Sequence, residues 1–228
     1  MKEKENTQIA AKDNKRLTKV LIADLALLLV AVFWGGGFVV TKNILAHMGP
    51  FYFLGIRFSA SALILLIIFN NRIRRTDFKT IKKGTIIGFF LFMGFATQTV
   101  GLLYTTPARQ SFITGTNVVM VPFIYMFVSG EKVEKNAVFG ALMTSIGLAV
   151  ISLQHGVMAF NLGDSLTLAC AVFFASHIVS IGMLVKEADP INLTIIQLAL
   201  TGIMSLIIAL IFEPIPQISL KAGVIGIG

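Results

Sequence analysis

The first apolar run of the chain, residues 20–41, reads VLIADLALLLVAVFWGGGFVVT and contains one charged side chain, Asp24. A helix needs about 20 mostly apolar residues to cross a bilayer. Hydrophobic residues make up 56% of the 228-residue chain and charged residues 13%, whereas a soluble domain carries about 25% charged residues. The sequence therefore predicts an all-α polytopic membrane protein. The predicted spans are residues 20–41, 50–70, 84–104, 107–129, 137–155, 163–185 and 191–212, and an eighth apolar run starts near Leu220.

The basic residues predict how the chain is oriented. Of the 19 lysines and arginines, fifteen lie in the tail of residues 1–19 or in the second, fourth and sixth loops. Cytoplasmic loops carry an excess of such residues, so we expect a multi-pass protein of the plasma membrane, in a bacterium, with a cytoplasmic N-terminus. Orientation within a lipid bilayer accounts for the net charge of +8, and we expect no nucleic-acid partner. The exceptions are Lys42, Arg57, Arg109 and Lys221.

The chain also contains a weak internal repeat. When the sequence is shifted by 140 residues, Pro50 aligns with Pro190 and Arg57 with Gln197. Five predicted helices separate the copies, so the second copy enters the membrane from the opposite side. Inverted repeats of this kind are typical of secondary transporters, whose substrate site lies near the midplane between the halves. We therefore assign residues 20–155 to a first five-helix repeat and 163–228 to a partial second one, and expect about two and a half further helices beyond Gly228.

Several short motifs occur in an order and spacing that resemble one family, the EamA-type ten-helix members of the drug/metabolite transporter superfamily. They are Phe33-Trp34-Gly35, Pro50 with Arg57, the stretch GLLYTTPA at residues 101–108, Pro122, Gly130-Glu131, and Gly140 to Gly147. The resemblance implies ten helices in two inverted repeats, both termini in the cytoplasm, and movement of small organic solutes, often outward. It predicts a secondary transporter for amino acids, metabolites or drugs that works by alternating access and exports its substrate.

Two other functions are kept as alternatives. A lipid or lipid-precursor translocase belongs to the same superfamily and would need a lateral opening between helices. A seven-helix receptor or retinal protein fits the number of complete spans. However, residues 191–212 contain no lysine for a retinal Schiff base, and a heptahelical receptor usually has its N-terminus outside.

Arg57 is the one charged residue of the predicted second span and is the first candidate for contact with a solute. A charge at the centre of a membrane helix costs about 2.5–3.5 kcal/mol, and such residues usually face a cavity or a partner. Arg57 either attracts an anionic group on a solute or extends its long side chain to the interface. Trp34 and Gly36 are candidates for the cavity wall, although glycines also allow helix backbones to pack closely.

Uncharged polar residues complete the predicted substrate cavity. Gln98 and Asn117 lie on the third and fourth predicted spans, which face the cavity in the family that the chain resembles. His177 of the sixth span could couple transport to protons, because histidine changes charge near neutral pH. A lone membrane histidine more often acts as a hydrogen-bonded strut between helices.

Other residues are assigned structural or gating roles. Thr106 and Pro107 are expected to cap and open the fourth span. The sequence has no HExxH, G-x-S-x-G or P-loop motif, and its histidines lie far apart. We therefore expect no enzyme activity, cofactor or metal, and a small-molecule substrate; the oligomeric state is left open, with a homodimer as one alternative. The residues given structural or gating roles are Pro50, Pro122, Glu131 and Pro190.

Overall fold

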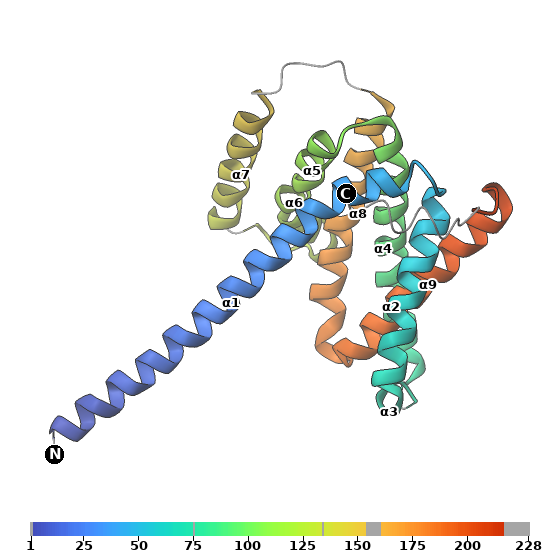
Figure 1. The fold of residues 1–228 in the computed structure, drawn as a ribbon. Coiled ribbons are helices and arrows are strands. Elements are labelled where there is room, and N and C mark those ends of the chain that lie inside the picture. Colours follow the sequence, from blue (N-terminus) through green and yellow to red (C-terminus); the bar gives the residue numbers. More distant parts are fainter. Residues whose placement is uncertain (1, 75, 134, 154–160, 217–228) are drawn as a thin grey trace. The chain divides into compact units, whose positions relative to one another are not determined.

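The computed structural model describes residues 2–74, 76–133, 135–153 and 161–216, and side chains are described from Val20 onward, except for residues 148–153. The described residues form helices and contain no β-strand (Figure 1). The chain divides into two units, residues 1–40 (the first unit) and residues 41–228 (the second unit). The helices are α1 (Lys2–Ile44), α2 (Pro50–Ile68), α3 (Asn70–Ile73), α4 (Phe78–Tyr104), α5 (Pro107–Gly115), α6 (Asn117–Ser129), α7 (Lys135–Leu153), α8 (Leu162–Leu184), the 3₁₀ helix η1 (Val185–Glu187) and α9 (Pro190–Phe212).

Six helical segments of the described chain are long and apolar enough to cross a membrane. They coincide with six of the predicted spans, which confirms the all-α polytopic fold. The predicted span 137–155 coincides with α7, although part of it lies outside the described residues, as does the apolar run from Leu220. The six segments are Val20–Ile44, Pro50–Ile68, Phe78–Tyr104, Pro107–Ser129, Leu162–Glu187 and Pro190–Phe212.

The structure differs from the predicted elements in three places. The tail of residues 1–19 continues the first span as one helix, because α1 begins at Lys2. The predicted span 107–129 is divided at Thr116, whose Oγ1 donates a hydrogen bond to the Ile113 carbonyl 2.6 Å away, so α5 and α6 are separate helices. The expected loop after α2 contains the short helix α3.

Proline and capping side chains determine where several helices begin. Pro50, Pro107 and Pro190 each stand in the first turn of a helix, where the missing N–H costs nothing. Thr106 Oγ1 accepts a hydrogen bond from the Arg109 N–H, as the sequence predicts. Asp77 Oδ1 accepts one from the Thr80 N–H. Hydrogen bonding from the Thr80 hydroxyl, and next from its N–H, lowers the pKa of the Asp77 carboxyl.

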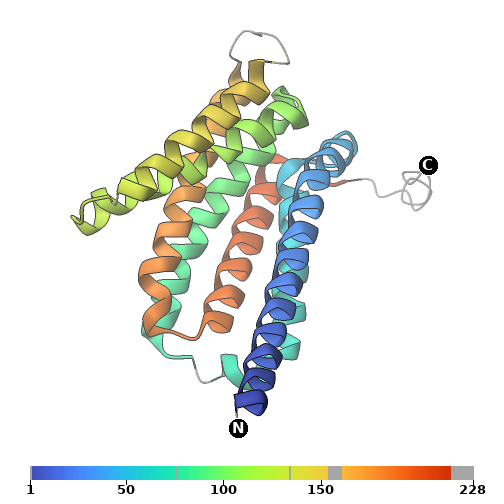
Figure 2. The ribbon, with the colours of Figure 1, turned by 90° about the vertical axis from the view of Figure 1, so that its left-hand side faces the viewer.

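Within the second unit, helices of the two predicted repeats pack against each other. α2 lies along α9, and α4 lies along both α8 and α9 (Figures 1 and 2). α5 and α6 contact α8, and α7 contacts α6. Two contacts depend on glycine: an added Cβ would lie 2.7 Å from the Ser59 nitrogen at Gly202, and 2.6 Å from the Gly101 oxygen at Gly163. Small residues replace the hydrophobic drive between membrane helices by letting backbones approach.

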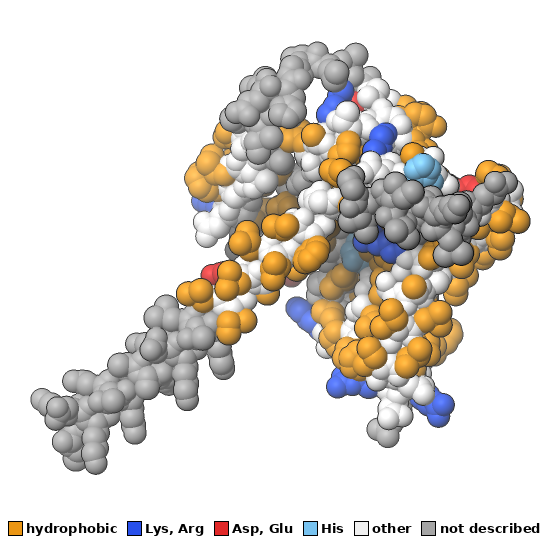
Figure 3. Space-filling model, viewed as in Figure 1, with side chains coloured by type: hydrophobic (Ala, Val, Ile, Leu, Met, Phe, Trp, Pro, Cys, Tyr) orange, Lys and Arg blue, Asp and Glu red, His pale blue; other side chains and the backbone are white. Residues whose placement is uncertain are grey.

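Apolar side chains cover much of the outer surface of the second unit. Ile67 of α2 and Phe127 of α6 are 74% and 90% exposed. In Figure 3 hydrophobic side chains cover α2, while basic side chains gather at the end where α3 lies. This pattern matches a lipid bilayer. The exposed apolar side chains would face the hydrocarbon, and the basic side chains at the α3 end would lie at the membrane–water interface.

Candidate functional site

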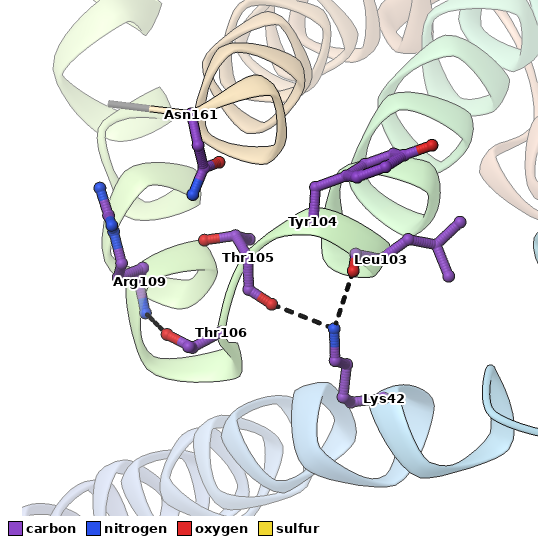
Figure 4. A pocket seen from close by; sticks show the side chains of 7 residues that line it. All are labelled: Lys42, Leu103, Tyr104, Thr105, Thr106, Arg109 and Asn161. Carbon is purple, nitrogen blue, oxygen red and sulfur yellow. Dashed lines mark hydrogen bonds between the residues drawn. The ribbon is translucent and has the colours of Figure 1, made fainter. Parts of the chain in front are cut away.

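A pocket of about 330 Å³ lies at one end of the second unit. We call this the pocket end; here α4 finishes, α5 and α8 begin, and the last turn of α1 (residues 41–44) contributes Lys42. The opposite end is where α4 begins, α8 finishes and α9 begins. The pocket is within the size range of small-molecule sites, about 300–1,000 Å³. Its lining residues are Lys42, Leu103, Tyr104, Thr105, Thr106, Arg109 and Asn161 (Figure 4).

Lys42 binds the carbonyl oxygens at the end of α4. Its Nζ donates hydrogen bonds to the carbonyl oxygens of Leu102 at 2.5 Å, Leu103 at 3.2 Å and Thr105 at 3.2 Å. Figure 4 draws the bonds to Leu103 and Thr105. The last carbonyls of a helix have no partner within it, and the helix dipole favours a cation there. Lys42 is one of the four basic residues outside the predicted cytoplasmic segments. Its ammonium group is hydrogen-bonded to backbone carbonyl oxygens rather than to a carboxylate.

Arg109 and Asp164 form an ion pair beside this pocket. Arg109 Nη2 lies 2.5 Å from Asp164 Oδ2, and Asp164 is fully buried. Thr105 Oγ1 donates a further hydrogen bond to Asp164 Oδ1 at 2.9 Å. The pair links the first turn of α5 to the first turn of α8, and its burial makes each partner costly to remove.

Asp164 is positioned by the start of its own helix. The Asn161 side chain accepts a hydrogen bond from the Asp164 N–H at 3.0 Å, and Asp164 Oδ2 accepts one from the Asn161 N–H at 3.0 Å. This reciprocal arrangement is a capping box, which satisfies two backbone donors at the start of a helix. The capping box therefore orients the carboxylate that receives Arg109.

Two ion pairs occupy the opposite end of the second unit. Arg72 Nη1 lies 3.3 Å from Asp189 Oδ2, and Lys83 Nζ lies 2.6 Å from Glu187 Oε2. Asn192 of α9 also donates from Nδ2 to the Arg72 carbonyl at 3.4 Å. These contacts join α3 and α4 to η1 and α9, so charged contacts connect helices at both ends of the unit.

Between the two ends, a buried polar cluster connects α4, α5 and α8. Gln110 Nε2 donates to the Gln98 carbonyl at 2.6 Å and to Thr167 Oγ1 at 3.3 Å. Gln98 Nε2 donates to Thr114 Oγ1 at 3.4 Å. Gln110 Oε1 is buried and has no hydrogen-bond partner among the described residues. The predicted cavity residue Gln98 therefore lies in a hydrogen-bonded interface between helices.

His177 and Gln197 form a hydrogen bond between α8 and α9. The distance from His177 Nε2 to Gln197 Oε1 is 2.7 Å. An amide oxygen accepts hydrogen bonds only, so Nε2 carries the proton in this contact. This geometry suits the strut between helices that is one of the two roles considered for His177.

Arg57 lies over a group of phenylalanine rings. Its guanidinium carbon is 5.4 Å from the ring centres of Phe58 and Phe95 and 6.0 Å from that of Phe53. These distances suit cation–π contacts, which extend to about 6 Å. Among the described residues no acidic side chain pairs with Arg57.

The remaining predicted site residues lie in several places. Asn117 is buried at the start of α6. Glu131 Oε2 accepts a hydrogen bond from the Tyr125 hydroxyl at 3.0 Å. Pro122 lies inside α6, where it cannot donate a backbone hydrogen bond. Trp34 and Gly36 belong to the first unit, and their role in a cavity wall stays a prediction.

The sequence interpretation missed the residues that build the pocket end. In the sequence, Lys42 and Arg109 stand out only as basic residues that lie outside the predicted cytoplasmic segments. Asp164 had a recognisable signal, because an asparagine three residues before an acid at the start of an apolar run indicates a capping box. Gln110 carried no signal, since its contacts depend on how α4 and α8 pack.

Comparison with known proteins identifies the family. The EamA-like transporter family matches residues 21–153, more than half of the chain. The chain belongs to this family. This EamA-like chain is 39% identical over 179 residues to an uncharacterized transporter of Archaeoglobus fulgidus, a match that covers 78% of the chain and 55% of that relative. The family assignment confirms the resemblance to the drug/metabolite transporter superfamily.

Two relatives of this EamA-like chain come from Bacillus subtilis. The uncharacterized transporter YyaM is 25% identical over 213 residues, covering 89% of the chain and 70% of the relative. The uncharacterized transporter YvbV is 28% identical over 198 residues, covering 85% and 64%. The chain thus spans between 55% and 70% of the length of these relatives. No solved structure matches it significantly.

Proposed function

We propose that this EamA-like chain belongs to a secondary transporter that moves small organic solutes, such as amino acids, metabolites or drugs, out of the cell by alternating access. The observation that carries the proposal is the family match over residues 21–153. The relatives named as transporters support it. Export, substrate class and mechanism are parts of this proposal, as are the plasma membrane and the cytoplasmic N-terminus.

The ion pairs support alternating access. Each ion pair between described residues joins a helix of the predicted first repeat to one of the predicted second repeat. Arg109–Asp164 joins α5 to α8 at the pocket end, and two pairs join α3 and α4 to η1 and α9 at the opposite end. A transporter that exposes its site to one side at a time must separate its halves at one end while the other stays closed.

The packing of α2 on α9 also supports two repeats that move relative to each other. These are the helices that the 140-residue shift aligns, and they lie side by side (Figure 2). Their contact includes Gly55 against Leu206 and Gly202 against Ser59. Small residues let the two helix backbones approach closely, and such a contact would suit a pivot about which the two halves rock.

A flux experiment tests the proposal. The full chain is reconstituted in proteoliposomes, and loss of preloaded radiolabelled amino acids and cationic drugs is measured with and without a pH gradient. We expect at least one solute to leave the vesicles faster than from protein-free vesicles, with saturation at high concentration. Absence of any saturable, protein-dependent flux across the panel would contradict the transport proposal.

A further inference from the structure

Arg57 places a positive charge inside a membrane-spanning helix. It lies seven residues after Pro50, which at about 1.5 Å per residue puts it about 10 Å into α2. The residue is exposed rather than enclosed by the second unit. A charge at this depth is rare and usually faces a partner or a water-filled cavity.

The aromatic group beneath Arg57 holds the guanidinium in a defined position. The Phe58 and Phe95 ring centres are 4.8 Å apart, and the Phe95 and Phe174 centres are 5.1 Å apart with an edge-to-face tilt. Phe95 in turn packs on the buried cluster of Leu91, Cys170 and Phe174. The rings under Arg57 are therefore continuous with the packed core between α2, α4 and α8.

Among the described residues of the second unit, no carboxylate pairs with this charge. Each described acidic residue of the second unit already has a partner at or near a helix end. The partners are Thr80 N–H for Asp77, the Tyr125 hydroxyl for Glu131, Arg109 for Asp164, Lys83 for Glu187, Arg72 for Asp189, and the N–H groups of Phe51 and Tyr52 for Glu213. Arg57 thus differs from Lys42, whose ammonium group is bound by three carbonyl oxygens.

The rings leave the donor edge of the guanidinium available. Cation–π contacts use the faces of the rings and provide no oxygen for the five N–H groups of arginine. A planar carboxylate matches these N–H groups through two parallel hydrogen bonds. Apolar rings beside the charge also suit the hydrocarbon part of a solute that carries such a group.

We infer that Arg57, together with Phe53, Phe58 and Phe95, forms a binding site for the carboxylate group of an amphipathic organic solute. This inference rests on the proposed transport function and names the chemical class of its substrate. Arg57 would bind the anionic group in the plane of the guanidinium. The partly exposed rings of Phe53 and Phe95 would contact the adjoining hydrocarbon, and the buried Phe58 would support the guanidinium from below.

A binding experiment with matched solutes tests this inference. The full chain is purified into nanodiscs, and dissociation constants are measured for hexanoate, phenylacetate and leucine and for hexanamide, phenylacetamide and leucinamide. Each pair shares its hydrocarbon part and differs in the carboxylate. The variants are Arg57→Gln and Arg57→Lys, and the control is Arg74→Gln, which removes one arginine charge from the exposed end of α3.

We expect at least one carboxylate to bind the wild type and Arg74→Gln equally, and its amide to bind at least about tenfold more weakly, as loss of a charged hydrogen-bonded pair requires. Arg57→Gln should weaken that carboxylate about tenfold or more and leave the amide unchanged. Arg57→Lys keeps the charge without the planar donor edge, so it should weaken the carboxylate by about threefold to tenfold. If Arg57→Gln does not fold, the carboxylate affinity of Arg57→Lys tests the inference instead.

Three results would overturn the inference: no carboxylate binds the wild type, the amides bind as tightly as the acids, or the Arg57 variants bind carboxylates as the wild type does. Failure of the transport proposal gives a different pattern. Arg57-dependent carboxylate binding without any flux would contradict transport and retain the site, whereas saturable flux together with carboxylate binding that does not depend on Arg57 would retain transport and contradict the site.

Discussion

Arg109 on α5 and Asp164 on α8 form an ion pair whose nitrogen and oxygen atoms are 2.5 Å apart, and Asp164 is fully buried. The Arg109 side chain keeps 24% of its surface exposed. Removing one partner of a buried pair leaves a charge without compensation and costs about 3–5 kcal/mol. Because Arg109 is partly exposed, we expect Asp164→Asn to lower the free energy of unfolding by about 3 kcal/mol, near the lower end of this range, as measured by denaturant titration in micelles.

The controls for this prediction separate the charge from the position. Ser165→Ala, at the next and exposed residue of α8, should change stability by less than about 0.5 kcal/mol. The double variant Arg109→Leu/Asp164→Leu should be more stable than Asp164→Asn, because apolar replacement of both partners removes the uncompensated charge. Equal loss in the double variant and in Asp164→Asn would show that the ion pair does not determine the effect.

Gly163→Ala should destabilise the contact between α4 and α8. The added Cβ would lie 2.6 Å from the Gly101 oxygen and 2.8 Å from the Tyr104 carbonyl carbon, and backbone atoms cannot rotate away. Overpacking costs about 1–3 kcal/mol, and we expect a loss near the upper end in a thermal denaturation assay. Gly182→Ala on the same helix meets no atom within 4 Å and is the matched control. Equal melting temperatures for the two variants would contradict the close contact.

The hydrogen bond from His177 to Gln197 should contribute measurably to the contact between α8 and α9. We expect a double-mutant cycle with His177→Ala and Gln197→Ala to give a coupling energy of about 0.6 kcal/mol and at most about 1.7 kcal/mol, the range found for polar contacts between membrane helices. The cycle uses the unfolding free energies of the two single variants and the double variant. A coupling energy of zero would exclude the strut as a stabilising contact.

Hydropathy and helix-start signals predicted most of the fold. The apolar runs located the membrane helices because each must satisfy its backbone within the bilayer. Pro50, Pro107 and Pro190 marked three helix starts, since proline suits the first turn. The division of α5 from α6 at Thr116 was not predicted, although Thr114-Gly115-Thr116-Asn117 interrupts the apolar pattern with residues that favour turns.

The sequence predicted less of the candidate site, because its contacts join residues far apart along the chain. Lys42 meets carbonyl oxygens about sixty positions away, and Arg109 meets Asp164 across 55 positions. Gln98 and His177 were predicted to line a substrate cavity, and that role stays a prediction; their partners Gln110 and Gln197 depend on how α4, α8 and α9 pack. Composition identifies which polar residues enter the membrane, and tertiary packing determines what they bind.

Labelling of two buried positions on α4 tests alternating access most directly. Leu102 lies in the last turn of α4, at the pocket end, and Thr80 lies in its first turn, at the opposite end. Each residue is less than a tenth exposed. Leu102→Cys and Thr80→Cys are made separately in a Cys170→Ser background, and membrane-impermeant maleimide is added from each side of the membrane. The Cys170→Ser parent, which has no cysteine, is the control for background labelling.

We expect a transported solute to change the labelling rates of the two cysteines in opposite directions, because one end opens as the other closes. Each cysteine should also react only from its own side of the membrane. Rates that rise or fall together, or a cysteine that reacts equally from both sides, would contradict alternating access.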